Sequence, residues 1–454
     1  MKIVRVTLIG LFGTIDHEVN FRKDEPTIVL GPNGAGKTHV LRLTAAVLSL
    51  DYSTLLNTAY RELSVRFEDS RELRVTRSVD EGGSPSVSIR SIPEDASSTA
   101  LIVTLDELES VGRNLPPEVR QVGPNRWLDE RRGTEYNASM LERRFGKSVD
   151  PLAAKLTDHP SISELCGPPK PVFIDTWRLD SRADDSLAGS WGRAPARSSS
   201  NAASRIRSYT ERLREEIAEA RRASVRATQS ADLSFAARAL QAASLSVNEK
   251  SLHSRYDETV RRHEALARNG LAVGEAPISF PESTTPTVRR ILNVFLDDWD
   301  QRLEPLLPVN EKLQVLREIL DSKLAPSGKR TSISAQGGLE FYNASGQRLL
   351  VSRLSSGEQH LVALFTLLLF AAKRNSLVLI DEPEISLHAA WKHAFLEDIS
   401  RVADTNGLQV ILATHSAGIV NGRWDLVEEL SLNTDSVLDI DIDSVLDDED
   451  DLDD

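Results

Sequence analysis

The sequence predicts an α/β fold with a mixed central sheet, an antiparallel β subdomain and an inserted α-helical arm. Residues 27–30 form an apolar strand that runs into a glycine-rich turn, and residues 39–48 after that turn have helical spacing. Two later apolar runs, residues 377–380 and 410–413, each end in polar side chains, as buried parallel strands do. We therefore expect these three strands to lie in one central sheet.

Short segments with alternating side chains occupy the first part of the chain. Residues 2–10 alternate apolar and polar side chains, which predicts a strand. Similar segments after the first helix predict an antiparallel sheet, at residues 63–67, 73–76 and 87–89. Residues 92–171 are rich in loops and give no clear pattern, whereas residues 171–175 predict another buried strand.

The middle of the chain predicts a helical insertion. Residues 189–201 are rich in Ser, Gly, Ala and Arg, which indicates a linker. Apolar side chains then recur at steps of three and four in residues 206–220 and 252–267, so we expect two amphipathic helices packed against one another. Two further helices and a hairpin turn are expected at residues 288–303, 311–324 and 343–346.

The charge of the chain is unevenly distributed. Lys and Arg number 54 against 68 Asp and Glu, and the net charge of −14 argues against a uniformly basic nucleic-acid binder. Eleven acidic residues lie in the last 20 residues, which predicts a disordered tail, with mimicry of nucleic-acid phosphates as the alternative. Residues 193–268 hold 15 basic and nine acidic residues, so any phosphate-binding face is expected there.

The cysteine content and the hydropathy pattern point to a cytoplasmic protein. Cys166 is the only cysteine, which excludes an intrachain disulfide and a zinc site built on paired cysteines. The N-terminus carries no pattern of a secretory leader. The apolar run at residues 361–372 is too short to cross a bilayer and predicts a buried helix, so we expect no membrane association.

The glycine-rich turn satisfies the pattern of a phosphate-binding P-loop. The pattern comprises Gly31, Pro32, Asn33, Gly34, Ala35, Gly36, Lys37 and Thr38. Its backbone amides would surround the β- and γ-phosphates of ATP, Lys37 would pair with them, and the Thr38 hydroxyl would bind Mg²⁺. A chance glycine-rich turn is the alternative, but the strand before it and the helix after it favour the P-loop.

A pair of carboxylates ends the apolar run at residues 377–380. Asp381 would hold Mg²⁺ through water, and Glu382 would orient or deprotonate the water that attacks ATP. Taken alone, such a pair is more often the solvated end of a strand. The presence of a P-loop in the same chain favours the catalytic interpretation.

The remaining motifs resemble those of ABC ATPase heads. The signature residues, which comprise Leu354, Ser355, Ser356, Gly357, Glu358 and Gln359, precede the acidic pair and a Thr-His-Ser segment around His415. The resemblance implies that Ser355 or Ser356, with Gly357, contacts the γ-phosphate of ATP bound to a second subunit. It also implies that His415 senses that phosphate beside Glu382. A helix N-terminus that cannot reach its own P-loop agrees with this dimeric arrangement.

The segment Asp381-Glu-Pro-Glu-Ile-Ser-Leu-His388 resembles the form common in the SMC, RecF and OLD (overcoming lysogenisation defect) ATPases, some of which act in antiphage defence. The sequence shows no zinc hook and no long heptad pattern, and with fewer than 40 residues after His415 we expect no Toprim nuclease domain of the kind that OLD proteins carry. We therefore expect an ATP- and Mg²⁺-dependent sensor ATPase that forms a homodimer or a higher even oligomer. It would control a separate, nuclease-like effector or bind DNA. The alternative is a RecF-like ATPase of DNA repair or recombination.

These expectations divide the chain into four units. They are an N-terminal ATPase lobe at residues 1–190, a helical arm at 191–325, a C-terminal ATPase lobe at 326–430 and an acidic tail at 431–454. Three arginines outside the motifs could belong to a basic groove, with ordinary solvated side chains as an equal alternative; they are Arg126, Arg131 and Arg132. Arg178 follows the buried strand at residues 171–175, where the resemblance places a basic residue near the active site.

Overall fold

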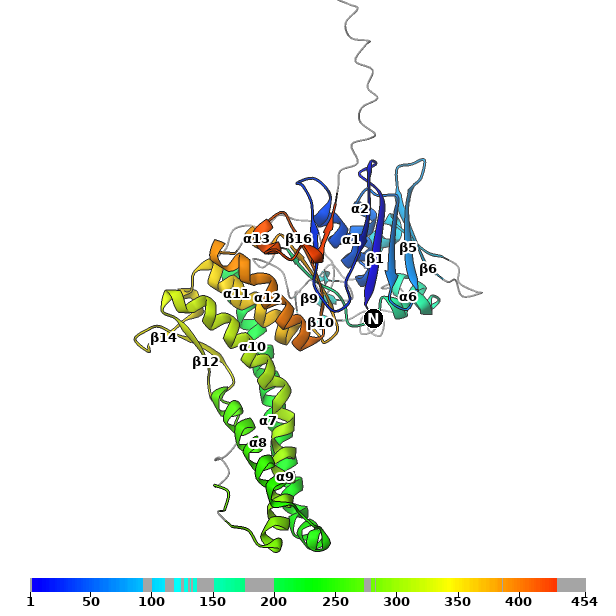
Figure 1. Cartoon of the computed structure of the whole chain (residues 1–454). Coiled ribbons are helices and arrows are strands. Elements are labelled where there is room, and N and C mark those ends of the chain that lie inside the picture. The colour runs from blue at the N-terminus through cyan, green and yellow to red at the C-terminus, as the bar shows by residue number, and fades with distance from the viewer. Residues whose placement is uncertain are drawn as a thin grey trace, which may run out of the picture.

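The computed structural model describes residues 2–92, 100–110, 118–123, 126–129, 131, 134–136, 151–175, 200–272, 279–281, 283–385 and 387–430. The chain forms a head that contains the β-sheets, and an arm of long helices projects from it (Figure 1). The acidic tail, most of the expected linker, Arg132, Arg178 and the side chain of Arg126 lie outside the described residues.

A five-stranded parallel sheet forms the centre of the head. The strands, in spatial order, are β11 (Val172–Asp175), β15 (Leu377–Asp381), β16 (Gln409–Thr414), β3 (Thr27–Leu30) and β17 (Val427–Glu429). The predicted α/β fold is confirmed, but parallel and antiparallel pairings occupy separate sheets rather than one mixed sheet. Since the strands are parallel, their carboxyl ends meet at one edge.

Both faces of the parallel sheet are covered, which explains why β15 is buried along its whole length. Val378 and Ile380 face a core built with α10 (Leu307–Leu324), α11 (Ser356–Thr366) and α12 (Ala389–Asn406). Leu377 and Leu379 face a second core, which includes α1 (Lys37–Ser49). Burial on both faces accounts for the continuous apolar runs in the sequence.

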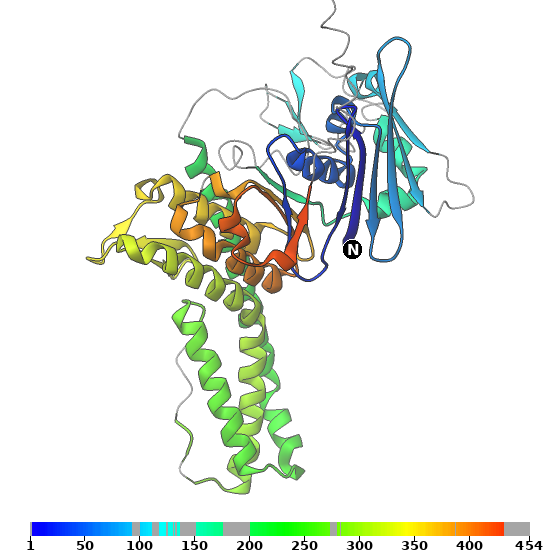
Figure 2. The same ribbon diagram turned by 45° about the horizontal axis from the view of Figure 1, so that its top comes forward.

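A six-stranded antiparallel sheet lies on the α1 side of the head (Figure 2). Its strands, in spatial order, are β2 (Ile15–Asn20), β1 (Ile3–Leu11), β4 (Glu62–Phe67), β5 (Glu72–Val79), β6 (Pro85–Ile92) and β7 (Leu101–Thr104). Their alternating pattern places one side chain in two in the core that includes α1, as the sequence predicts. The side chain of Gln409 joins the two sheets, because it bonds to both the N–H and the carbonyl oxygen of Ile3.

Smaller elements complete the head. Around the antiparallel sheet they are α2 (Tyr52–Asn57), α3 (Leu105–Ser110), β8 (Val119–Gly123), β9 (Arg126–Asp129), β10 (Thr134–Tyr136), α5 (Pro151–Thr157) and α6 (Pro160–Leu165). The C-terminal part of the head adds β12 (Arg330–Ile333), β13 (Leu339–Tyr342), β14 (Arg348–Leu349) and α13 (Ala417–Val420). Short helical turns join several of these elements, and two more lie in the arm, η1 (Ala242–Ser244) after α7 and η2 (Glu304–Leu306) after α9. The hairpin predicted at residues 343–346 is confirmed as the turn between β13 and β14.

The arm consists of α7 (Ser200–Gln241), α8 (Glu249–Arg268) and α9 (Pro286–Leu303), and α9 leads into α10. The prediction that the first two helices pack against one another is wrong, because each packs mainly against α9 or the head instead. Leu296 of α9 fills a small core with two side chains of α8, and Arg302 near the end of α9 donates to Thr228 of α7. The α9 helix therefore packs against both helices, and the predicted apolar face of α7 at residues 206–220 is also buried in the head core that includes α11.

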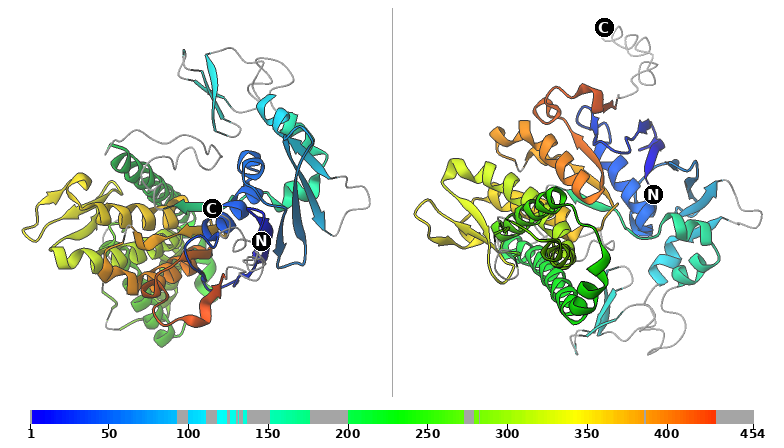
Figure 3. Two further views of the ribbon diagram at one scale, coloured as in Figure 1. Left: turned by 90° about the horizontal axis from the view of Figure 1, so that it is seen from above. Right: turned by 60° about the horizontal axis from the view of Figure 1, so that its bottom comes forward.

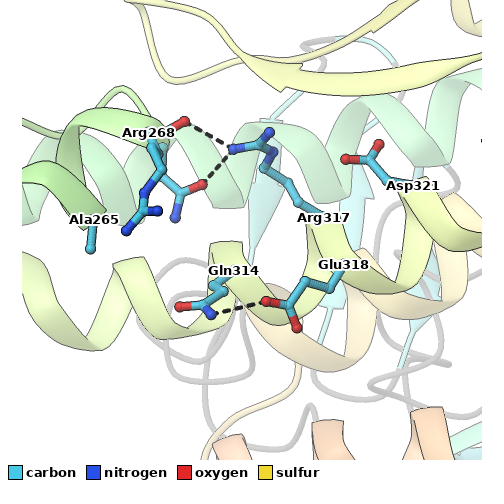
Figure 4. A pocket seen from close by; sticks show the side chains of 7 residues that line it. Ala265, Arg268, Gln314, Arg317, Glu318 and Asp321 are labelled. Carbon is cyan, nitrogen blue, oxygen red and sulfur yellow. Dashed lines mark hydrogen bonds between the residues drawn. The ribbon is translucent and has the colours of Figure 1, made fainter.

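The base of the arm is tied to α10 by polar contacts at the end of α8 (Figure 4). Arg317 donates to the carbonyl oxygen of Arg268 at 2.9 Å and to Oδ1 of Asn269 at 2.7 Å. These contacts satisfy acceptors at a helix C-terminus, where cations are favoured. A cavity of about 360 Å³ lies beside them, between α8 and α10.

The apolar run at residues 361–372 is buried, as the sequence predicts. It begins within α11 and continues into η5 (Leu367–Ala371), a π-helical turn. Within the described ranges, each helix is too short or too polar to span a lipid bilayer.

Candidate nucleotide site

The glycine-rich turn joins the carboxyl end of β3 to the N-terminus of α1. Gly34 and Gly36 have φ values of 87° and 83°, and Gly36 is the residue that caps α1. Residues with a side chain rarely adopt this left-handed backbone conformation, so both positions favour glycine. Pro32, Asn33 and Gly34 form the exposed part of the turn, Gly31 and Gly36 are half-buried, and Ala35 is buried.

Two side chains from the antiparallel sheet support the turn from behind. A Cβ atom at Gly36 would lie 2.6 Å from Cδ2 of Leu11, so this position is closed to larger residues. The Nε2 atom of His17 lies 2.6 Å from the carbonyl oxygen of Ala35. Because a carbonyl oxygen only accepts, His17 is the donor. In a trans peptide the N–H points away from the C=O, so this bond directs the Gly36 N–H away from His17.

Lys37 is buried at the start of α1, with 5% of its surface exposed. Its Nζ atom donates to the carbonyl oxygens of Gly31 at 2.8 Å and Pro32 at 3.0 Å. The ammonium group is therefore held against the turn by neutral acceptors. Phosphate oxygens are stronger, charged partners for the same group.

Asp381 ends β15 beside Thr38, and its carboxyl group is strongly perturbed. Burial raises the pKa of Asp381 to about 6, the Thr38 hydroxyl acts in the opposite direction, and the nearby carboxylates of Asp175 and Glu382 raise it further. Within the described part of the chain, its Oδ1 atom is buried without a hydrogen-bond partner. An unpartnered carboxylate oxygen next to a hydroxyl fits a Mg²⁺ ligand set, which phosphates and water would complete.

Asp175 is a site residue that the motifs did not reveal. It ends β11 and lies directly beside Asp381 in the register of the sheet. Arg42 of α1 contacts it, with Nη2 3.6 Å from Oδ2. The predicted strand at residues 171–175 placed Asp175 at a strand end, but only the strand order brings it next to Asp381.

Glu382 follows β15 in a strained conformation, with φ at 45°. Its N–H donates to the carbonyl oxygen of Ala413 at 2.8 Å, which fixes the backbone to the neighbouring strand. The Nδ1 atom of His415 lies 3.6 Å from Oε1 of Glu382. A positive φ in a glutamate is costly and is concentrated at functional sites.

Glu384 is a second residue to which the motifs assigned no role. It lies in η6 (Pro383–Ile385) and is 4% exposed. Its Oε1 atom contacts Thr414, the last residue of β16, and His415, which follows it. The only indication in the sequence is its place in the Asp-Glu-Pro-Glu segment.

The signature residues open α11, as their pattern predicts. Ser355 caps the helix in a reciprocal arrangement with Glu358, whose Oε2 accepts from the Ser355 N–H at 2.7 Å. The carboxylate of Glu358 is buried and also accepts from Lys329 and Ser327, and the Lys329 ammonium offsets the effect of burial and keeps the pKa of Glu358 low. Gln359 donates to the carbonyl oxygen of Leu354 at 2.8 Å, whereas Ser355 and Ser356 are exposed.

The structure separates the signature residues from the glycine-rich turn. The α11 helix belongs to the core on one face of the parallel sheet, and α1 belongs to the core on the other face. Figure 3 shows α11 and α1 in different parts of the head. The structure therefore brings together the turn, Asp381, Glu382 and His415, whereas Ser355, Ser356 and Gly357 lie elsewhere.

A family model described as "AAA domain, putative AbiEii toxin, Type IV TA system" matches residues 175–421, which is more than half of the chain. The chain belongs to this AAA family. Over 78 residues, which are 17% of this chain, it is 42% identical to protein ea59 of Escherichia phage lambda. That segment is 14% of the phage protein, so the chain spans a small part of this relative.

Three solved structures of SMC heads are similar to this AAA chain at low identity. One is an SMC head bound to the C-terminal winged-helix domain of ScpA, with a TM-score of 0.38, 13% identity, and coverage of 92% of this chain and 91% of that one. An SMC head from Pyrococcus furiosus with an extended coiled coil gives a TM-score of 0.36, 15% identity, and coverage of 95% and 93%. The SMC head of Thermotoga maritima gives a TM-score of 0.31 and 9% identity, and the match covers 94% of each chain.

The match to the AAA family includes most of the site. Its range begins at Asp175 and ends after His415, so it contains the signature residues and the Asp381–Glu384 segment. The glycine-rich turn at residues 31–38 lies outside the matched range. The AAA family membership supports nucleotide binding, and the glycine-rich turn outside the matched range has left-handed glycines and holds the buried Lys37 at its end.

Proposed function

We propose that the protein hydrolyses ATP and that ATP-driven dimerisation of its heads controls a separate effector protein. The observation that carries this proposal is the shared edge of the parallel sheet. There the glycine-rich turn with Lys37 and Thr38 lies beside Asp381, and Glu382 lies beside His415. Hydrolysis of a phosphoanhydride needs a phosphate-binding turn, a carboxylate that can hold Mg²⁺ and a group that can orient the attacking water, and this edge offers a candidate for each.

Each residue at this edge has a distinct task in the proposal. Thr38 and Asp381 would hold Mg²⁺, which would neutralise charge on the phosphates. Lys37 would exchange its two carbonyl acceptors for oxygens of the β- and γ-phosphates. Glu382 would accept a proton from the attacking water, and His415 would meet the γ-phosphate beside it.

Dimerisation follows from the place of the signature residues. Ser355 and Ser356 are exposed at the N-terminus of α11, in the lobe that packs on the opposite face of the sheet from α1. The N–H groups that open a helix bind anions, so these residues would contact the γ-phosphate held by a second head. Glu358 and Gln359 are engaged within their own chain, so we assign them to shaping this helix terminus.

The charges of the arm support an effector protein over DNA as the target. Many arginines of the arm are paired with acids, among them Arg222 and Arg226 with Glu219, and Arg255 with Asp297 and Asp300. These acids lower the net positive charge that the arm presents to a phosphate backbone. The family description, which names a putative toxin of a type IV toxin–antitoxin system, is compatible with a role in defence that uses a second protein.

The Glu382→Gln variant tests the proposed function. The amide keeps the shape of the side chain but cannot accept a proton, so ATP binding should persist while kcat falls ~100-fold or more. We expect ATP to convert this variant into a stable dimer, measured by light scattering on a sizing column. The Glu397→Gln variant, altered at an exposed position of α12, is the matched control and should behave as wild type.

Two outcomes would contradict the proposal. Unchanged turnover in Glu382→Gln would assign the proton acceptor to another residue. A protein that stays monomeric with ATP in both variants would reject the shared site. The product of the neighbouring gene tests whether the protein acts on a separate effector. A nuclease that binds the trapped dimer would support the proposal, whereas a DNA-repair protein would favour the RecF-like alternative.

A further inference from the structure

Glu384 occupies an unusual position for a charged side chain. It is 4% exposed, and it lies in η6, between the acidic end of β15 and α12. Among the described residues, its Oε2 atom is buried without a hydrogen-bond partner. An unsatisfied carboxylate oxygen in the interior destabilises a fold, so stability alone does not explain this residue.

The other carboxylate oxygen of Glu384 holds the end of β16. Its Oε1 accepts from the Thr414 hydroxyl at 2.5 Å and from the His415 N–H at 3.0 Å. The same oxygen lies 3.2 Å from Nδ1 of the His415 ring. One atom therefore contacts the strand end, the next backbone amide and the imidazole.

These contacts determine how the His415 ring is presented. A carboxylate oxygen repels a nitrogen lone pair, so its approach to Nδ1 at 3.2 Å favours the tautomer that carries the proton on Nδ1. The Nε2 atom is then left for a partner outside this cluster. Glu382 lies on the same side of the ring as Glu384, with Oε1 3.6 Å from Nδ1.

We propose that Glu384 is a positioning residue for ATP hydrolysis, which fixes the orientation and tautomer of His415 and acts only through it. The inference rests on the proposed hydrolysis of ATP at this edge of the sheet. Glu384 would contact neither ATP nor the attacking water. Its removal should therefore lower kcat and leave ATP affinity nearly unchanged.

A double-mutant cycle between Glu384 and His415 tests this inference. Glu384→Gln should lower kcat ~10-fold with less than about a twofold change in the Kd for ATP, because only the presentation of one ring changes. In a His415→Ala background, the same substitution should change kcat by less than about twofold, since coupled residues do not act additively. The ratio of kcat values is the readout, and the melting temperature Tm of each variant is measured alongside it.

Two further variants separate positioning from support of the fold. Thr414→Val removes one hydrogen bond to Oε1 but keeps both contacts of His415, so kcat should fall less than in Glu384→Gln. Glu384→Ala should lower kcat at least as much as Glu384→Gln. If Glu384→Ala fails to fold, the cycle with Glu384→Gln decides alone.

The results distinguish this inference from the proposed function. Equal loss of kcat in the wild-type and His415→Ala backgrounds would overturn the inference while ATP hydrolysis stands. Wild-type kcat in Glu384→Gln would also overturn it. A wild-type protein that binds ATP without hydrolysing it would instead reject the proposed function.

Discussion

His17 donates a hydrogen bond of 2.6 Å to the carbonyl oxygen of Ala35, and this bond joins the antiparallel sheet to the glycine-rich turn. The side chain of His17 is buried, so the bond is shielded from water. Since the Ala35 carbonyl points to His17, the following N–H points the opposite way. The geometry of the turn therefore depends on a residue from a different sheet.

Loss of this bond should weaken nucleotide binding. A net contribution of about 1 kcal/mol per hydrogen bond predicts a rise of ~5-fold in the Kd for ATP in His17→Phe. His17→Gln retains an N–H donor and should recover part of the affinity. Isothermal titration with a non-hydrolysed ATP analogue measures both values.

Glu18→Gln is the matched control, because Glu18 is the next residue of β2 and is exposed. It should bind the analogue as wild type does. Wild-type affinity in a folded His17→Phe protein would show that Leu11 and the glycines hold the turn without His17.

Asp381 should make the nucleotide-free protein less stable as the pH rises. The pKa of Asp381 is about 6 in the folded chain, whereas the ordinary pKa of an aspartate, 3.8, applies to the unfolded chain. Folding therefore favours the protonated form. The contribution of Asp381 to the free energy of unfolding should fall by about 3 kcal/mol at most between about pH 4 and pH 6 and then level off. Asp381→Asn should therefore raise Tm at pH 8 and change it little at pH 4, while it abolishes hydrolysis.

Calorimetry in EDTA measures this effect without bound metal. Asp404→Asn, altered on the exposed side of α12, controls for the general loss of one negative charge. A larger stabilisation by Asp381→Asn at pH 4 than at pH 8 would contradict the sign of the raised pKa.

Mixing two inactive variants should restore hydrolysis if the site is shared between heads. Lys37→Ala removes the phosphate-binding cation, and Gly357→Asp places a negative charge at the signature residues. In a mixed dimer, one pocket carries both defects and the other carries neither. Partial recovery of kcat is expected, measured after exchange of fluorescently labelled subunits. No recovery of kcat despite proven subunit exchange would argue against the shared pocket, or would show that hydrolysis requires two intact pockets in one dimer.

Much of the site could be predicted because its motifs are local. The turn at residues 31–38, Asp381 and Glu382 each follow an apolar run, and burial on both faces of the sheet makes those runs continuous. The helices could be predicted for a similar reason, because the spacing of their apolar side chains indicates one buried face. The hairpin could be predicted from its local turn residues.

The residues that the sequence did not reveal act across the sheet. His17 and Ala35 are 18 positions apart, and Glu384 and Thr414 are 30 positions apart. Nothing in the local sequence distinguishes these residues from other polar residues, because only the order of the strands brings them together. Likewise, periodicity gives α7 and α8 an apolar face but does not say that α9 packs against α8 while α7 contacts both α9 and α11.

The place of β3 has a consequence for the order in which the chain folds during synthesis. β3 comes from the start of the chain, yet both of its neighbours, β16 and β17, come from the end. The bond between Ile3 and Gln409 spans 406 positions. Closing such a long loop is slow compared with the local contacts of the arm helices. The arm helices can therefore form on the ribosome before the parallel sheet is complete. Until β16 and β17 emerge, β3 has neither of its neighbouring strands.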